Sequence, residues 1–317
     1  MHKSLLFIAL FLSAGCAVAQ PVAEPVVEAS ESVLPLILPL DNQVETVADG
    51  YAFTEGPAVG PDGKVYFTDI TPSRIMQFDP ATGETLVFRE DSGGANGLFF
   101  YNNHLYACEG DRRRVGVYKP LHKANGDAFG HTPASSSVAA EILGAPFNKP
   151  NDLTVDAKGG VYFTDPDFGN RKGPKPPVEG VYYVTPEGQV TCVVDNLARP
   201  NGVALTHDGT RIYIQDVGAN LIQTYDVVAP GQLENPQVFA DVAKLNGGIP
   251  DGLCIGPQGN VYTALYTGGA IVVHDENGQQ LQMVGTGPAT TNCVLGPDGK
   301  YLYVTADKSL KRIRLAP

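Results

Sequence analysis

The amino-acid sequence predicts an all-β fold built from six similar units, and three observations support that prediction. Six times, a side chain that carries an oxygen precedes a tyrosine by about eleven residues, and these pairs recur at intervals of roughly 40–55 residues. The chain is rich in turn residues, with 36 glycines and 25 prolines, and it contains no long helical pattern. The leading residues are Glu55, Asn96, Asn151, Asn201, Asp251 and Asn292, and the tyrosines are Tyr66, Tyr106, Tyr162, Tyr213, Tyr262 and Tyr303.

Each unit contains the signature of a β-hairpin. A turn with Gly or Asn precedes an alternating aromatic and β-branched run, as in GPDGKVYFTD (60–69), AKGGVYFTD (157–165) and HDGTRIYIQD (207–216). Units of this length that hold several short strands are typical of propeller blades with about four strands each. The sequence therefore predicts a six-bladed β-propeller over residues 43–317.

The two ends of this predicted domain both have strand-like sequences. Residues 43–47 and 310–315 are short runs in which apolar and polar residues alternate. A ring of blades closes best when one blade combines strands from both termini. We therefore expect these two segments to pair.

The first residues have the pattern of a targeting segment rather than of a folded element. Lys3 precedes an apolar run that is too short to span a bilayer, and Ala17-Val18-Ala19 is a small-x-small cleavage site. We expect residues 1–19 to be a signal peptide and residues 20–42 to be a disordered acidic leader with a short strap. The protein would then be exported, periplasmic or secreted, with a lipoprotein anchored through Cys16 as the alternative.

The composition excludes several classes of partner. The formal net charge is -12 and no basic run occurs, which argues against nucleic acid binding, and no later segment resembles a membrane span. Four cysteines would remain after cleavage, namely Cys108, Cys192, Cys254 and Cys293, and they form no C-x-x-C motif. Disulfides and buried free thiols both remain open for them, and we expect a monomer or a weak dimer.

The six leading residues predict a metal site in the centre of the ring. The innermost strand of each blade lines the channel of a propeller, so residues at one equivalent position form a ring. Asn96, Asn201 and Asp251 are each followed by Gly, and any one of them alone is explained by the frequency of Asn and Asp in turns. Six buried polar side chains in register would be costly without a partner, and a cation would satisfy them together. Carboxylate and amide oxygens without His or Cys fit Ca²⁺ best.

Two of the six positions carry an acid, Glu55 and Asp251, and together they balance the charge of a divalent ion. An ion held there would polarise a carbonyl or phosphoryl oxygen, and Asp251 is the candidate base that activates water. No G-x-S-x-G nucleophile elbow occurs, so a serine hydrolase route is unsupported.

The chain resembles the gluconolactonase family, also called the regucalcin or senescence marker protein family, from about residue 45 to 315. The resemblance rests on several stretches, among them FTEGPAVGPDGKVYFTDI (53–70), KPNDLTVDAKGGVYFTDPDFG (149–169), RPNGVALTHDG (199–209) and IPDGLCIGPQGNVYTA (249–264). It implies a six-bladed propeller with one catalytic divalent cation (Ca²⁺, Zn²⁺, Mg²⁺ or Mn²⁺) and hydrolysis of sugar lactones, with a small-molecule lactone as substrate.

The resemblance also implies roles for individual residues. Glu55, Asn151, Asn201 and Asp251 match the metal ligands, with Asp251 also the general base and Asn151 also a substrate contact. Lys149 stands where the regucalcin branch has an arginine that binds substrate, so sugar recognition is expected to differ.

Two further residues complete the expected substrate contacts. Asn96 lies in register with the ring, and Glu109 is expected at the channel entrance, with a solvated charged loop as its alternative.

Two other functions remain open from the sequence. The same metal propeller could hydrolyse phosphotriesters or other esters, because substrate choice depends on loops. A non-catalytic propeller that binds a protein or a glycan is the other alternative.

Overall fold

The computed structural model describes residues 44–118, 135–169, 173–245 and 248–315. The predicted signal peptide (1–19) and the predicted leader and strap (20–42) lie outside the described residues, so they stay predictions. Everything described belongs to one unit of the chain, residues 36–317.

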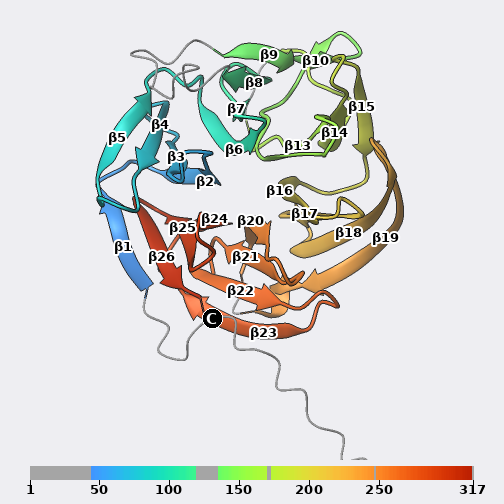
Figure 1. Cartoon of the computed structure of the whole chain (residues 1–317). Helices are drawn as coiled ribbons and strands as arrows, with labels where there is room; N and C mark the ends of the chain where they lie inside the picture. Colours follow the sequence, from blue (N-terminus) through green and yellow to red (C-terminus); the bar gives the residue numbers. More distant parts are fainter. Residues whose placement is uncertain (1–43, 119–134, 170–172, 246–247, 316–317) are drawn as a thin grey trace, which may run out of the picture. The chain divides into compact units, whose positions relative to one another are not determined.

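Six four-stranded antiparallel sheets are arranged around a central axis, which confirms the predicted six-bladed β-propeller (Figure 1). The first blade contains β2 (Thr54–Val59), β3 (Val65–Asp69), β4 (Arg74–Phe78) and β5 (Thr85–Arg89). The second contains β6 (Ala95–Tyr101), β7 (His104–Glu109), β8 (Arg114–Tyr118) and β9 (Ser136–Ala139). The third contains β12 (Leu153–Val155), β13 (Val161–Asp165), β14 (Gly180–Val184) and β15 (Val190–Val194). A short ribbon of β10 (Glu141–Ile142) and β11 (Ala145–Pro146) lies between the second and third blades in the chain.

The fourth and fifth blades follow the same order of strands. The fourth blade contains β16 (Pro200–Leu205), β17 (Arg211–Asp216), β18 (Leu221–Ala229) and β19 (Gln232–Asp241). The fifth contains β20 (Pro250–Ile255), β21 (Val261–Leu265), β22 (Ala270–His274) and β23 (Gln280–Gly285). The 3-10 helix η1 (Val242–Lys244) lies between these two blades in the chain, and it is the single helical element of the described residues.

The sixth blade combines strands from both ends of the domain. It contains β24 (Thr290–Leu295), β25 (Tyr301–Ala306), β26 (Ser309–Arg314) and, outermost, β1 (Val44–Asp49). Strand β1 pairs antiparallel with β26 in a register that places Val44 opposite Ile313. An ion pair between Glu45 and Arg312 at 2.7 Å joins the same two strands. The predicted pairing of the terminal strands is confirmed.

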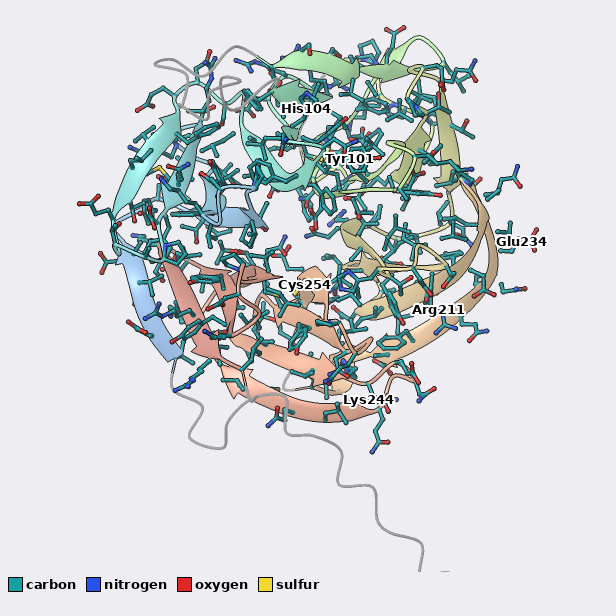
Figure 2. The ribbon with its side chains drawn as sticks, viewed as in Figure 1. Tyr101, His104, Arg211, Glu234, Lys244 and Cys254 are labelled. Atoms are coloured by element: carbon teal, nitrogen blue, oxygen red, sulfur yellow. The ribbon has the colours of Figure 1, made fainter. Side chains whose placement is uncertain are left out.

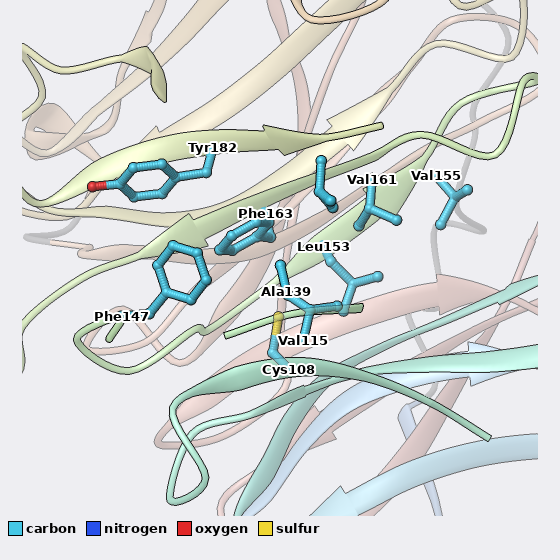
Figure 3. Packing of buried hydrophobic residues seen from close by; sticks show 10 residues of the cluster. Cys108, Val115, Ala139, Phe147, Leu153, Val155, Val161, Phe163 and Tyr182 are labelled. Atoms are coloured by element: carbon cyan, nitrogen blue, oxygen red, sulfur yellow. The ribbon is translucent and has the colours of Figure 1, made fainter. Parts of the chain in front are cut away.

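The hydrophobic core lies between neighbouring blades. Six clusters of buried apolar residues each combine side chains from two adjacent blades, so both faces of every sheet are covered. Figure 3 shows the cluster between the second and third blades, where Cys108 and Val115 meet Leu153 and Phe163. Coverage on both faces explains why every residue of a strand such as β13 is buried, instead of buried and exposed residues alternating.

The repeated tyrosines supply much of this core. Five of the six tyrosines have at most a few percent of their surface exposed, and Tyr106 of the divergent second unit is partly exposed. No helix in the described part of the chain is long and apolar enough to cross a bilayer.

Candidate functional site

The first strand of each blade faces the central channel, and these inner strands carry the residues of the predicted ring (Figure 1). Glu55, Asn96, Asn201, Asp251 and Asn292 lie in β2, β6, β16, β20 and β24, whereas Asn151 stands two residues before β12. All six are buried, with 4–8% of their surface exposed. Residues from all six inner strands line a cavity of about 510 Å³, whose lining includes Asp152 and Asn292 but none of the four predicted metal ligands.

A β-bulge marks the ring position in five of the six inner strands. The pairing register with the second strand shifts directly at or beside Glu55, Asn96, Asn201, Asp251 and Asn292. A bulge leaves residues unpaired and re-aims their side chains. Five separate blades therefore present the same position to the axis by the same backbone device.

The glycines after several ring residues allow neighbouring inner strands to approach each other closely. A Cβ added to Gly252 would lie 2.0 Å from Cγ of Asn292, and one added to Gly202 would lie 2.4 Å from the carbonyl oxygen of Asp251. A larger residue at either position would push two ring residues apart.

Three buried aspartates at the ends of second strands hold the segments that lead into the ring. Asp69 accepts hydrogen bonds from the N–H groups of Ala52 and Phe53, Asp165 from those of Asn148 and Lys149, and Asp216 from those of Ala198 and Arg199, all at 2.7–3.1 Å. We call these three residues the carboxylate clamps.

Each carboxylate clamp grips the chain two and three residues ahead of one predicted ligand, namely Glu55, Asn151 or Asn201. A carboxylate that accepts two backbone N–H groups fixes the chain more firmly than neutral groups do, because charge-assisted hydrogen bonds are the stronger ones. The fourth predicted ligand, Asp251, is approached differently, since Thr267 Oγ1 accepts from the N–H of Ile249 at 3.1 Å.

Glu109 occupies the clamp register in the second blade but contacts different partners. Its carboxylate is fully buried and accepts hydrogen bonds from Arg114 Nε at 2.6 Å, from Tyr118 Oη at 3.1 Å and from the Ser135 hydroxyl. Arg112 forms a further ion pair with it at 3.3 Å. The predicted contact of Glu109 with substrate stays a prediction, and it would require one of these partners to be displaced.

The structure brings Glu55, Asn201 and Asp251 together. Asn201 Nδ2 donates to Asp251 Oδ1 at 2.7 Å, and the carboxyl groups of Glu55 and Asp251 act on each other's pKa. Burial raises the pKa of Glu55 well above its ordinary value, and the charge of Asp251 raises it further. Burial raises the pKa of Asp251 from 3.8 to about 8, although the hydrogen bond from Asn201 opposes the shift.

Asp152 is a third acid of this group, and it is not among the site residues that the sequence predicts. Burial raises its pKa from 3.8 to about 7, and its charge acts on both Glu55 and Asp251. Asn292 Nδ2 is 3.5 Å from Asp152 Oδ2, and the Asn292 side chain also opposes the rise in the pKa of Glu55. The signal was present in the sequence, because the residue after the ring position is glycine in four units and an acid only here.

Asn151, Asn96 and Lys149 each have different neighbours. Asn151 is held by backbone hydrogen bonds to Thr164 and Gly97. The carbonyl oxygen of Asn96 accepts from Thr68, while its Oδ1 is buried with no hydrogen-bond partner among the described residues. The aliphatic part of Lys149 packs beside Gly110.

The chemistry of these side chains fits a divalent cation. Three buried acids lie within mutual electrostatic reach, and the groups that act on their pKa values are other acids and hydrogen-bond donors. A cation bound among these three acids would remove the repulsion between their carboxylates. Among the described residues no three His, Cys, Asp or Glu side chains form a ligand group by themselves, so amide oxygens would have to complete the coordination.

A family model described as the SMP-30/gluconolactonase/LRE-like region matches residues 53–308. The chain belongs to this family. It is 26% identical over 310 residues to a gluconolactonase of Zymomonas mobilis, an alignment that covers 89% of this chain and 83% of the relative.

Two solved structures illustrate the same fold. A gluconolactonase from Xanthomonas campestris is 26% identical and superposes with a TM-score of 0.76, covering 90% of this chain and 94% of the other. A calcium-binding regucalcin from Agrobacterium tumefaciens, at 19% identity, has a TM-score of 0.71 with coverage of 86% and 95%, and it supports the fold alone.

Proposed function

We propose that this enzyme hydrolyses sugar lactones with the help of a divalent cation at the ring of Glu55, Asn151, Asn201 and Asp251. The observation that carries the proposal is the group of buried acids and amides in the channel, whose carboxyl pKa values are raised by burial and by one another. Membership of the gluconolactonase family supports the choice of lactones. Oxygen-only donors favour Ca²⁺ over softer ions.

A cation bound there would neutralise the acids and polarise the carbonyl oxygen of the lactone. Asp251 would accept a proton from the attacking water, because a carboxylate held in a buried site is a stronger base than one in solvent. The hydrogen bond from Asn201 holds the Asp251 carboxyl group in one orientation. Water oxygen would bond to the carbonyl carbon, the ring C–O bond would break, and the proton on Asp251 would pass to the departing alkoxide.

The other residues of the channel would orient the substrate. Lys149 leads directly into the ring, and its backbone N–H is fixed by Asp165 at 2.8 Å. Its ammonium group can donate to the hydroxyl groups of a sugar lactone or to the carboxylate of the product. Asn96, with a free buried Oδ1, offers an acceptor for a hydroxyl group in the same channel.

The test is the substitution Asp251→Asn, which preserves the shape of the side chain and removes its basicity. We expect the variant to fold, to bind Ca²⁺ more weakly, and to lose at least about 100-fold in kcat on glucono-1,5-lactone with saturating Ca²⁺. Near-normal turnover would remove Asp251 from the role of base. A parallel assay on an organophosphate ester distinguishes a lactonase from the phosphotriesterase alternative, since faster turnover of that ester would contradict the proposed substrate class.

A further inference from the structure

Two cysteines from neighbouring blades meet at the wall of the central channel. Cys254 lies in β20 of the fifth blade and Cys293 in β24 of the sixth, and their Sγ atoms are 3.5 Å apart. Both residues line the cavity of about 510 Å³. Figure 2 shows Cys254 close to the centre of the ring.

The surroundings of the two thiols differ. Cys254 is partly exposed toward the cavity, whereas Cys293 is 2% exposed and packs in the core between the fifth and sixth blades. The Sγ of Cys293 also lies 3.5 Å from the carbonyl oxygen of Tyr262. A small reagent can therefore reach Sγ of Cys254 from the cavity, and Sγ of Cys293 lies next to it in the core.

Strands β20 and β24 approach each other closely beside the two cysteines. Gly252 of β20 leaves no room for a Cβ against the side chain of Asn292 in β24, one residue before Cys293. A disulfide has an S–S length of about 2.05 Å, so the two sulfurs need to approach by about 1.5 Å. Small rotations of the two side chains next to an open cavity can supply this movement.

We propose that Cys254 and Cys293 are an oxidisable pair that forms an intramolecular disulfide between the fifth and sixth blades. In the first step, the Cys254 thiolate attacks a low-molecular-weight disulfide, forms a mixed disulfide and releases one small thiolate. In the second step, Cys293 gives up its proton as its sulfur attacks the Cys254 sulfur, and the other small thiolate leaves. The protein loses two electrons and two protons, and the small disulfide becomes two thiols.

The link would act on the closure of the ring and on the predicted metal site. The sixth blade contains both terminal strands, so a bond to the fifth blade joins the closing blade covalently to its neighbour. The N–H of Cys293 donates to Oδ1 of Asn292 at 2.8 Å, and Asn292 contacts Asp152 and Glu55. The predicted export of the chain would place the pair where oxidants are available, although the inference does not depend on the proposed lactonase activity.

The test compares the full chain after treatment with glutathione disulfide and after treatment with dithiothreitol. Free thiols are alkylated under denaturing conditions, and peptides are identified by mass spectrometry. We expect one cross-linked species that joins the peptides of Cys254 and Cys293, with a Tm about 5–10 °C above that of the reduced protein. Alkylation of both cysteines after oxidation would overturn the proposal, and so would glutathione retained on Cys254.

Matched variants keep the test decisive. Cys254→Ala and Cys254→Ser change a partly exposed residue, so we expect both to fold and to lose the difference in Tm between oxidised and reduced protein. Cys192→Ala changes another partly exposed cysteine and should retain that difference in full. A redox-dependent Tm that survives in both Cys254 variants would refute the pairing.

Discussion

The substitution Asp216→Asn tests whether the carboxylate clamps hold the predicted metal ligands in position. Asp216 is 3% exposed and accepts from Ala198 N at 3.0 Å through Oδ2 and from Arg199 N at 2.9 Å through Oδ1. Asparagine can reproduce only one of these bonds, because its Nδ2 group is itself a donor and would face an N–H.

The expected loss of stability follows from the one hydrogen bond that asparagine cannot form. One hydrogen bond to a charged acceptor is lost, worth about 1.5–3 kcal/mol. In a domain of this size we expect Tm to fall by about 4–8 °C. The segment that leads to Asn201 would also be held by one bond instead of two, and a ligand displaced by a fraction of an ångström typically costs about 10- to 100-fold in kcat/KM.

The assay combines thermal unfolding with lactone hydrolysis at saturating Ca²⁺. Asp275→Asn is the control, because Asp275 accepts from Asn277 N at 2.9 Å and Gln279 N at 2.8 Å through the single atom Oδ1 in an outer turn, and an asparagine oxygen can accept both. The control should lose less stability and keep full activity. If Asp216→Asn loses stability as expected yet retains full kcat/KM and Ca²⁺ affinity, the clamp does not position Asn201 and the reasoning fails.

Three further outcomes are expected. Metal-free protein should lose stability as pH rises from about 4 to about 8. In the folded protein Asp152 and Asp251 have pKa values of about 7 and about 8 and stay protonated, whereas in the unfolded chain they ionise near 3.8. Calorimetry in the presence of a chelator measures this, and a Tm that rises between about pH 4 and about pH 8 would contradict it. Lys149→Ala should raise KM for glucono-1,5-lactone about tenfold, with Lys149→Arg restoring most of the affinity; an unchanged KM in steady-state assays would exclude a substrate contact. Mass spectrometry of the mature protein should find Gln20 at the N-terminus, and an acylated Cys16 would establish the lipoprotein alternative.

The sequence predicted the fold well because its repeat has a physical cause. Each tyrosine such as Tyr66 or Tyr162 fills the space between two blades, and that burial forces one aromatic per unit at a constant distance from the axis. The pairing of residues 43–47 with 310–315 followed from the need to close a ring, and the register of β1 with β26 confirms it.

Parts of the site could not be predicted in the same way. Asp152 breaks the repeat instead of following it, so the positions that the six units share do not identify it. The carboxylate clamps were visible as the Asp that ends YFTD and YIQD, but their role depends on N–H groups that only the folded chain brings within reach. Glu109 looked like a charge at the channel entrance, whereas its partners Arg114 and Tyr118 come from the neighbouring strand β8.

The sixth blade sets the order in which the chain can finish folding. Strand β1 is the first element of the propeller to be made, yet its partner β26 is the last. The outermost hydrogen bonds of the ring therefore form only after the whole domain has been synthesised, and the closing contact has the longest sequence separation of any in the fold. Contacts of this kind form slowly, so β1 stays without its partner strand for as long as synthesis continues.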